Sequence, residues 1–349
     1  MISEMEKNRQ ERSWLEKIPA AYWILGILLL IMPGVAGDFI LFQIFGWGFI
    51  LGIIALSLMF LAGYGGMVSL VQMTVAGSAG YMIAIFGVSA IENISLGWPW
   101  YLAIPLALAI ATLFGTLAGW LAVRTEGIYT IMITLAIASA FFYFTRQNYV
   151  IFNGFSGFNG VLPPNLFGVD WRQPAAFYYL TLFWAVLAYG TVIYVSRSPF
   201  GLVLQGIRDN PRRMSALGYN VVAHRVAAYA FAAFLAAIGG ILLTWQSAQI
   251  SPGTAGIGPV IDILVITVIG GMRHPIGPFI GALIYVVLKT FALDALVAIG
   301  LSGERFQLLI GIGFLAIVFW SSDGVLGIWN HWQQARKRDP LLDRGGSTP

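Results

Sequence analysis

Residues 40–62 read ILFQIFGWGFILGIIALSLMFLA, a stretch of 23 residues without a charged side chain. A helix needs about 20 apolar residues to cross the hydrocarbon core of a bilayer, so this stretch is long enough to be a membrane span. Comparable runs recur along the 349-residue chain, of which 58% is hydrophobic and 10% is charged. Soluble domains are about a quarter charged. The sequence therefore excludes an ordinary soluble globule and predicts an all-α, polytopic helical membrane protein.

Apolar runs bounded by charges, prolines or glycine clusters predict about ten transmembrane helices. For the first run a cleaved signal peptide is the alternative, but we expect a retained span because it fits the topology. The eighth run is short for a full crossing and is compatible with a tilted, broken or re-entrant element. The predicted spans are 20–36, 40–62, 66–90, 98–123, 127–145, 177–196, 226–247, 259–272, 275–297 and 306–322.

Lysine and arginine are unevenly distributed between the two sides of these spans. With the N-terminus inside, 15 of the 19 lie on inner segments, three lie on outer segments, and Lys289 lies in or near a span. Cytoplasmic loops retain such residues, so we expect both termini in the cytoplasm. The net charge of +4 then reflects the orientation of the chain in the membrane, and we expect no nucleic-acid partner. The expected divisions are an N-terminal segment 1–19, a membrane domain 20–325 with an outer loop 146–176 and an inner loop 197–225, and a tail 326–349.

Several kinds of chemistry are excluded by what the sequence lacks. The chain has no cysteine, so disulfides, thiolate metal sites and cysteine nucleophiles are ruled out. Its histidines, His224, His274 and His331, do not pair with acidic residues at metal-ligand spacing. The phosphate-binding pattern G-x-x-x-x-G-K-[ST] is absent as well. We therefore expect no catalytic residue, no metal site and no cofactor in this chain.

The stretch RDNPRRMSALGYN, residues 208–220, is charged and lies in the predicted inner loop. Asn210 is a favourable N-cap, Pro211 suits the first helical position, and Gly218 is the residue most often found just past a helix end. The pattern predicts a short helix over 211–217. A basic loop that only enforces topology is the alternative, but topology needs charge and not caps. The caps favour a rigid helix that transmits force from a soluble partner.

Neutral polar residues interrupt the predicted third and fifth spans, and one acidic residue lies near the outer end of the eighth. Glycine-broken segments expose backbone groups to cavities in membrane proteins, and ionisable residues at membrane depth are functional candidates. A chain of buried acidic residues and histidines, as in a proton relay, is missing. The candidate residues of a solute pathway are Ser69, Gln72, Thr74, Ser78, Thr134 and Asp262.

Close helix packing is the competing explanation for the small and polar residues, because glycine, serine and threonine let helices approach. The pairs Gly77-x-x-Gly80, Gly115-x-x-x-Gly119 and Gly277-x-x-x-Gly281 fit that explanation. The triplet Gly-Gly-Met also occurs twice, at 65–67 and 270–272, each time near the inner start of a span. Two short matches are a weak sign of an internal repeat.

Four sequence blocks resemble the permease subunits of ABC importers for branched-chain amino acids, in the LivM-type branch. The block SPFGLVLQGIRDNPRRMSALGYNVVAHRVAAYAFAAFLAAIGGIL, residues 198–242, is similar to the cytoplasmic coupling loop and the following span of that family. The blocks 124–144 and 250–283 agree with it. The block 63–85 agrees more loosely, since Val71 and Gln72 stand where a Gly-His-type pair is common. The resemblance covers roughly residues 40–325.

The resemblance implies an ABC importer permease fold in a bacterial inner membrane. Its implied partners are a second, paralogous permease, two ATPase subunits that bind ATP and Mg, and an extracytoplasmic solute-binding protein. The implied solute is a branched-chain or related small hydrophobic amino acid, with urea and short amides as alternatives. An ion-coupled carrier or channel, and a membrane enzyme acting on a lipid-borne substrate, are competing classes. The residues implied to contact the ATPase are Arg208, Asp209, Asn210, Pro211, Arg212, Arg213, Met214, Ala216, Leu217 and Gly218.

Overall fold

The computed structural model describes residues 20–164, 168 and 170–298; the predicted span 306–322 and the tail lie outside them. Within these residues the chain is helical, with one short antiparallel sheet. The helices are α2 (Ala20–Ile31), α3 (Trp47–Met59), α4 (Gln72–Phe86), α5 (Trp100–Ala122), α6 (Ile128–Gln147), α7 (Tyr149–Phe152), α8 (Pro174–Arg197), α9 (Pro199–Asp209), α10 (Pro211–Ala216), α11 (Val221–Ser247), α12 (Ile257–Gly270) and α13 (Gly277–Ala298). The strands and shorter turns are β1 (Phe158–Asn159), β2 (Gln249–Ile250), η2 (Met32–Gly34), η3 (Ile40–Gly46), η4 (Phe60–Tyr64), η5 (Gly154–Ser156) and η6 (Pro252–Ala255).

Five helical segments in the described part of the chain are long and apolar enough to cross a bilayer. Three further apolar helices are shorter, at Gln72–Phe86, Ile257–Gly270 and Gly277–Phe291. The helical membrane architecture expected from the sequence is therefore present, whereas the count of ten spans and the side of the termini stay predictions. The five long segments are Ile40–Tyr64, Trp100–Ala122, Ile128–Gln147, Pro174–Arg197 and Val221–Ser247.

Two predicted spans differ from the structure. In the first, 20–36, helix α2 ends at Ile31 and a 3₁₀ turn containing Pro33 follows. The 12 residues of α2 cover about 18 Å, too little for a hydrocarbon core of about 30 Å. In the third, 66–90, the helix begins at Gln72, and residues 66–71 are not helical. The short eighth prediction, 259–272, corresponds to α12, an apolar helix of 14 residues; whether it crosses the membrane stays a prediction.

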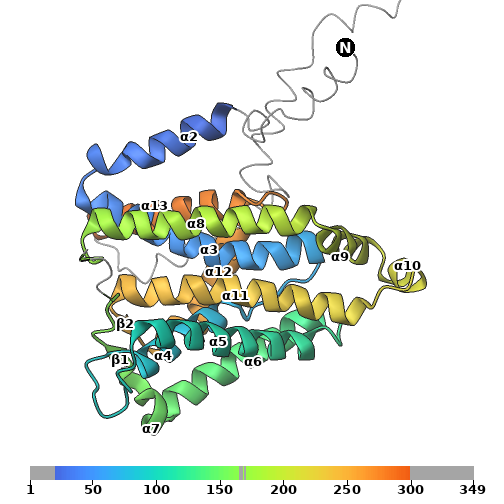
Figure 1. Ribbon diagram of the computed structural model, residues 1–349, viewed down its shortest axis with the longest axis horizontal. Coiled ribbons are helices and arrows are strands. Elements are labelled where there is room, and N and C mark those ends of the chain that lie inside the picture. The colour runs from blue at the N-terminus through green and yellow to red at the C-terminus, as the bar shows by residue number, and fades with distance from the viewer. Residues whose placement is uncertain (1–19, 165–167, 169, 299–349) are drawn as a thin grey trace, which may run out of the picture.

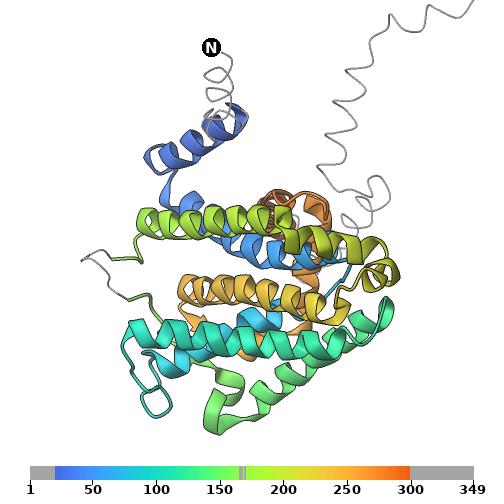
Figure 2. The ribbon, with the colours of Figure 1, turned by 45° about the vertical axis from the view of Figure 1, so that its right-hand side comes forward.

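Helix α11 is the central element of the bundle. In both views it lies between α8 and α3 on one side and α5 and α6 on the other (Figures 1 and 2). It packs against α3, α4 and α5. Helices α9 and α10 lie at one end of the bundle, and α7 and the strands lie at the opposite end (Figure 1). We call these the α10 end and the sheet end.

Small residues bring α5 close to α11. The exposed face of α5 carries large side chains such as Leu113, Leu117 and Trp120. A Cβ atom on Gly115 would collide with the Ala233 side chain of α11, and one on Gly119 with the Tyr229 ring. Glycine is thus what permits this contact, as the packing explanation of the sequence expected. Residues spaced by four share one helix face, and the buried face of α5 is lined by Ala103, Ala107, Ala111 and Gly115.

Replacement of Gly119 by valine is expected to destabilise the bundle by about 1–3 kcal/mol, because the added side chain overlaps the Tyr229 ring. Gly190→Val is the matched control, since a Cβ on Gly190 of α8 meets no atom within 4 Å. Thermal unfolding of the detergent-solubilised protein measures both variants. Equal melting temperatures for the two would contradict the packing described here.

Candidate functional site

The inner loop predicted at 197–225 contains two helices, of which the sequence analysis predicted only the second. Helix α9 starts as α10 does: the Ser198 hydroxyl accepts from the Gly201 amide at 3.3 Å, with a proline at the first helical position. The same Ser-Pro signal stands in the sequence and could have predicted α9. Its buried face carries Gly201, Leu204 and Ile207. The loop is therefore a helical hairpin seated on the bundle.

Helix α10 has the predicted caps at both ends. The Asn210 side chain accepts from the Arg213 amide at 2.9 Å. At the other end Gly218 has φ +91°, its amide bonds to the Ser215 carbonyl at 3.0 Å, and the Tyr219 amide bonds to the Met214 carbonyl at 3.1 Å. This pair of bonds is the Schellman arrangement. The caps satisfy the end groups of the short helix.

The two helices of this hairpin differ in burial. No residue of α10 is buried, and Arg212, Arg213 and Leu217 are exposed, the last to 67%. Met214 packs back on α9, because a Cβ on Gly206 would lie 2.8 Å from its sulfur atom. Helix α10 is thus held by α9 and displays a basic and partly apolar surface at the α10 end.

Arg208 joins the hairpin to the membrane helices. Its Nη1 donates to the Gly63 carbonyl at 2.5 Å, and its Nη2 lies 2.9 Å from Asp209. The stem of the side chain covers Gly66, where a Cβ would lie 2.6 Å from Arg208 Cγ. The sequence analysis grouped Arg208 with Arg212 and Arg213 as partner contacts. In the structure its guanidinium also has partners within the chain, and its contact with a partner subunit stays a prediction.

The Gly63 carbonyl is available to Arg208 because the preceding helix is irregular. Residues 60–64 form a π-helical segment, η4. The Gly66 amide bonds to the Ala62 carbonyl and the Met67 amide to the Leu61 carbonyl, so neither uses Gly63. Gly66 then turns the chain with φ +67°, a conformation that glycine adopts without steric cost. The glycines at 63, 65 and 66 were the signal for this irregularity in the sequence.

Residues 66–71, which we call the glycine break, run non-helically inside the protein. Ser69 and Val71 are fully buried. The Leu70 amide donates to the Thr134 hydroxyl of α6 at 3.1 Å, and the Val71 amide to the Ser69 hydroxyl at 3.4 Å. Without water, buried backbone groups need such partners. Ser69 and Thr134 therefore stabilise the interrupted backbone, which is a structural role beside any role in transport.

The remaining pathway candidates of α4 are enclosed by neighbouring helices. Gln72, Thr74 and Ser78 are buried, and α4 packs against α3, α5, α6, α11 and α12. Gln72 accepts from Ser57 at 3.2 Å, and Ser78 donates to the Val75 carbonyl at 2.8 Å. The Gln72 Nε2 and the Thr74 hydroxyl have no partner among the described residues. These two groups are free to bind a solute only if α4 moves.

Asp262, the sixth candidate, differs from the other five because it lines a cavity. The cavity measures about 500 Å³, and its wall includes Asp262, Tyr285 and Lys289 as well as Met73 of α4. None of the five other candidates lines it or the three further cavities described at this bundle. The structure thus brings Asp262 close to α4 but does not join all six candidates in one open channel.

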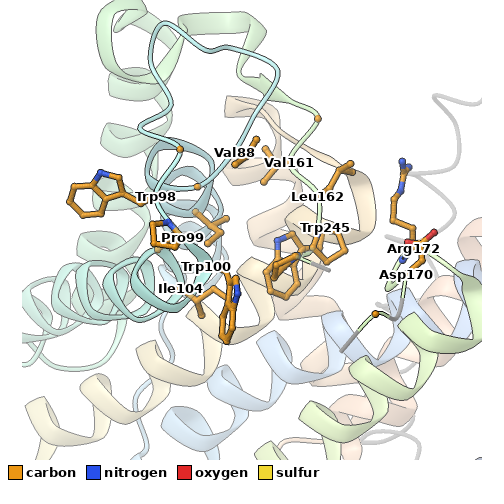
Figure 3. A pocket seen from close by; sticks show the side chains of 18 residues that line it. Val88, Trp98, Pro99, Trp100, Ile104, Val161, Leu162, Asp170, Arg172 and Trp245 are labelled. Atoms are coloured by element: carbon orange, nitrogen blue, oxygen red, sulfur yellow. Dashed lines mark hydrogen bonds between the residues drawn. The ribbon is translucent and has the colours of Figure 1, made fainter. Parts of the chain in front are cut away.

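Two further cavities lie at opposite ends of the bundle. A cavity of about 770 Å³ at the sheet end has an aromatic wall of Trp98, Trp100 and Trp245, with Asp170 and Arg172 on the opposite side from Trp98 (Figure 3). A smaller one of about 170 Å³ at the α10 end is lined by Gly66, Thr130, Glu126, Pro211 and Arg225. The smaller cavity places the start of α10 beside the glycine break.

Among the described residues, no group of three or more histidine and acidic side chains could hold a metal ion. Polar groups buried in an apolar helical bundle, with a capped basic helix at one end, are typical of polytopic membrane proteins that handle polar solutes. The family follows from comparison. The model of the family described as branched-chain amino acid transport system / permease component matches residues 40–318, and this chain belongs to that family.

The relatives that this chain resembles are named for different solutes. The chain is 22% identical over 297 residues to the high-affinity branched-chain amino acid transport system permease protein LivM of Escherichia coli, covering 78% of this chain and 65% of LivM. It is 25% identical over 215 residues to the ribose import permease protein RbsC of Haemophilus influenzae, covering 59% of this chain and 65% of RbsC. The chain thus spans less than two thirds of the length of each of these relatives. No solved structure matches.

Removal of the Arg208 contact is expected to loosen the glycine break. In Arg208→Gln the Gly63 carbonyl loses a charged donor, and local opening becomes easier by about 1 kcal/mol, or about fivefold in amide exchange. Hydrogen-exchange mass spectrometry of a peptide covering residues 60–71 measures this. Arg212→Gln, an exposed change four residues away, is the control. Equal exchange in the two variants would show that Arg208 does not hold the break.

Proposed function

We propose that this chain is a membrane-spanning permease subunit of an ABC importer that translocates branched-chain or related small hydrophobic amino acids. The observation that carries the proposal is the capped helix α10, exposed at one end and tied through α9 and Arg208 to the glycine break. Membership of the permease family supports it. In this proposal α10, with the flanking residues 208–218, docks on an ATPase subunit.

The α10 end faces the cytoplasm in this proposal. Support comes from charge, because Arg212, Arg213, Arg225 and Arg124 belong to α10, the start of α11 and the turn after α5, all at that end. Arg146, at the end of α6, belongs to the sheet end. Basic residues are retained on the cytoplasmic side of membrane proteins. The sheet end then faces outward, toward the solute-binding protein.

The proposed mechanism is mechanical. A displacement of α10 by the ATPase moves α9, because Met214 packs on Gly206. Arg208 passes the motion to Gly63 and Gly66. The glycine break leads directly into α4, so its movement shifts Gln72 and Thr74, whose polar atoms lack partners in the described state. A rigid, doubly capped helix suits this task because a flexible loop would dissipate the motion.

The partners of the proposed importer supply what this chain lacks. ATP and Mg are bound by two ATPase subunits, a second permease completes the membrane part, and a binding protein delivers the solute. The proposed location is a bacterial inner membrane. A sugar is the second candidate solute, because one relative is named as a ribose import permease. Uptake of leucine, isoleucine, valine, urea, a short amide and ribose by the reconstituted complex separates these possibilities.

Charge reversal of α10 is expected to break coupling. In Arg212→Glu/Arg213→Glu, ATP-dependent uptake falls by at least about tenfold, while membrane insertion and abundance stay the same, because neither side chain is buried. Proteoliposomes containing all subunits report uptake and ATP hydrolysis together. Arg212→Lys/Arg213→Lys, which keeps both positive charges, is the control. Unchanged uptake by a correctly assembled complex would refute the role of α10.

The pathway assignment is tested on α4. Gln72→Leu and Ser78→Val are each expected to lower the maximal uptake rate about tenfold, because a solute in transit loses polar partners there. Thr191→Val is matched to Ser78→Val, since Thr191 of α8 also bonds a carbonyl three residues earlier, at 2.9 Å. Initial rates in proteoliposomes are compared after normalising for complex abundance. Parental rates and selectivity in both α4 variants would remove these residues from the pathway.

A further inference from the structure

The cavity of about 500 Å³ beside Asp262 lies between several separate parts of the bundle. Its wall combines residues of α3, α4, the end of α11, α12 and α13 with single residues of η3, β2 and η6. Small-molecule sites in proteins commonly measure about 300–1,000 Å³, so the size suits one amino acid. Helix α12 begins at the sheet end and Asp262 is its sixth residue, so the cavity lies toward that end, on the side from which an importer receives solute.

The chemistry of the wall is divided. Leu51, Met73, Ile263 and other apolar side chains form one part of it. The other part carries an acidic residue, Asp262, and a basic one, Lys289. A wall of this kind fits a molecule with an apolar side chain and a charged head.

Asp262 and Lys289 both line the cavity, and they do not form a direct ion pair among the contacts of the described residues. Lys289 Nζ lies 5.9 Å from the ring centre of Tyr285, one turn earlier on α13. Tyr285 also interacts with the Asp262 carboxylate. Separated opposite charges at membrane depth are costly, and an occupant with both charges would offset that cost. A purely structural ion pair would be expected in direct contact.

We propose that this cavity holds the solute during transit as a zwitterion, with its ammonium group at Asp262, its carboxylate at Lys289 and its apolar side chain against Leu51, Met73 and Ile263. The inference rests on the proposed import function and names the solute class within it. Ribose and urea carry no charges, so they form an ion pair with neither side chain and gain less from such a wall. The site therefore selects for amino acids over the neutral solutes.

The position of Met73 links the cavity to α4. Met73 belongs to the cavity wall, and its neighbours along the chain are Gln72 and Thr74, whose polar atoms lack partners in the described state. Withdrawal or rotation of α4 removes Met73 from the wall and turns these polar groups toward the solute. The cavity is thus a holding site before the glycine-broken segment, and movement of that segment releases the solute inward.

Neutralising each charge tests the site in the complete transporter. Asp262→Asn and Lys289→Gln are each expected to lower the maximal rate of leucine uptake at least about tenfold, while the KM for the leucine-loaded binding protein stays within about twofold, because the substitutions alter the cavity wall and not the surface on which the binding protein docks in this proposal. Glu92→Gln, an exposed acidic residue of the loop after α4, is the control. Unchanged rates in both charge variants would overturn the proposal.

A labelling experiment covers the case in which the charge variants fail to assemble. Because the chain has no cysteine, Thr254→Cys provides a single, partly exposed thiol in the cavity wall. A small water-soluble methanethiosulfonate reagent is expected to label it in the assembled complex, and leucine, but not ribose or urea, to slow labelling about tenfold. Asn93→Cys, exposed in the loop after α4, is the control that leucine does not protect. A cavity thiol that does not react, or that leucine fails to protect, overturns the site.

The two hypotheses fail differently. If the parental complex shows no ATP-dependent uptake of any tested solute, the proposed function fails. If it imports leucine while Asp262→Asn, Lys289→Gln and the protection of Thr254→Cys give the overturning results, the function stands and the zwitterion site is refuted. Import of ribose with no protection by leucine likewise refutes the site but keeps the transporter.

Discussion

The structure depends on one constraint, that backbone groups away from water must find partners within the protein. The chain interrupts its third span at 66–71, and this is tolerated because α4 is surrounded by α3, α5, α6, α11 and α12. The Thr134 hydroxyl accepts a hydrogen bond from the Leu70 amide. Close packing of the surrounding helices requires glycine where α5 meets α11 and where α4 meets α11, since a Cβ on Gly80 would collide with Thr244. The glycines at these contacts allow the close packing, and the closely packed helices surround the glycine break and supply a partner for its backbone.

The same constraint explains why the α10 end is suited to transmit motion. The π-helical segment η4 leaves the Gly63 carbonyl to Arg208, so an irregular membrane helix is completed by a side chain of the α9–α10 hairpin. Gly63, two residues before the first Gly-Gly-Met triplet, directly faces the Met272 carbonyl of the second triplet, after α12. Both triplets therefore lie at this end and near each other in space. The turn between α12 and α13 abuts the point where Arg208 acts.

The choice of solute is not decided by family membership. Relatives named for branched-chain amino acids and for ribose match this chain at comparable identity. Discrimination needs groups that contact the solute. The cavity with Asp262 and Lys289 is where the described residues place two opposite charges beside an apolar surface, and charge separation is a property that zwitterions have and sugars lack.

The sequence by itself determined the features whose causes lie within a few residues. Apolar runs gave most of the membrane helices, and Asn210 and Gly218 gave the caps of α10. The same local signal at Ser198 would have given α9. Only the tertiary structure decided that the Gly63 carbonyl accepts a hydrogen bond from Arg208, 145 residues away. It also decided that five polar pathway candidates are buried and that Asp262 lines the same cavity as Lys289. Caps and apolar runs are local preferences of the chain, whereas bonds and cavities between helices depend on which faces meet, and helix periodicity alone does not fix that.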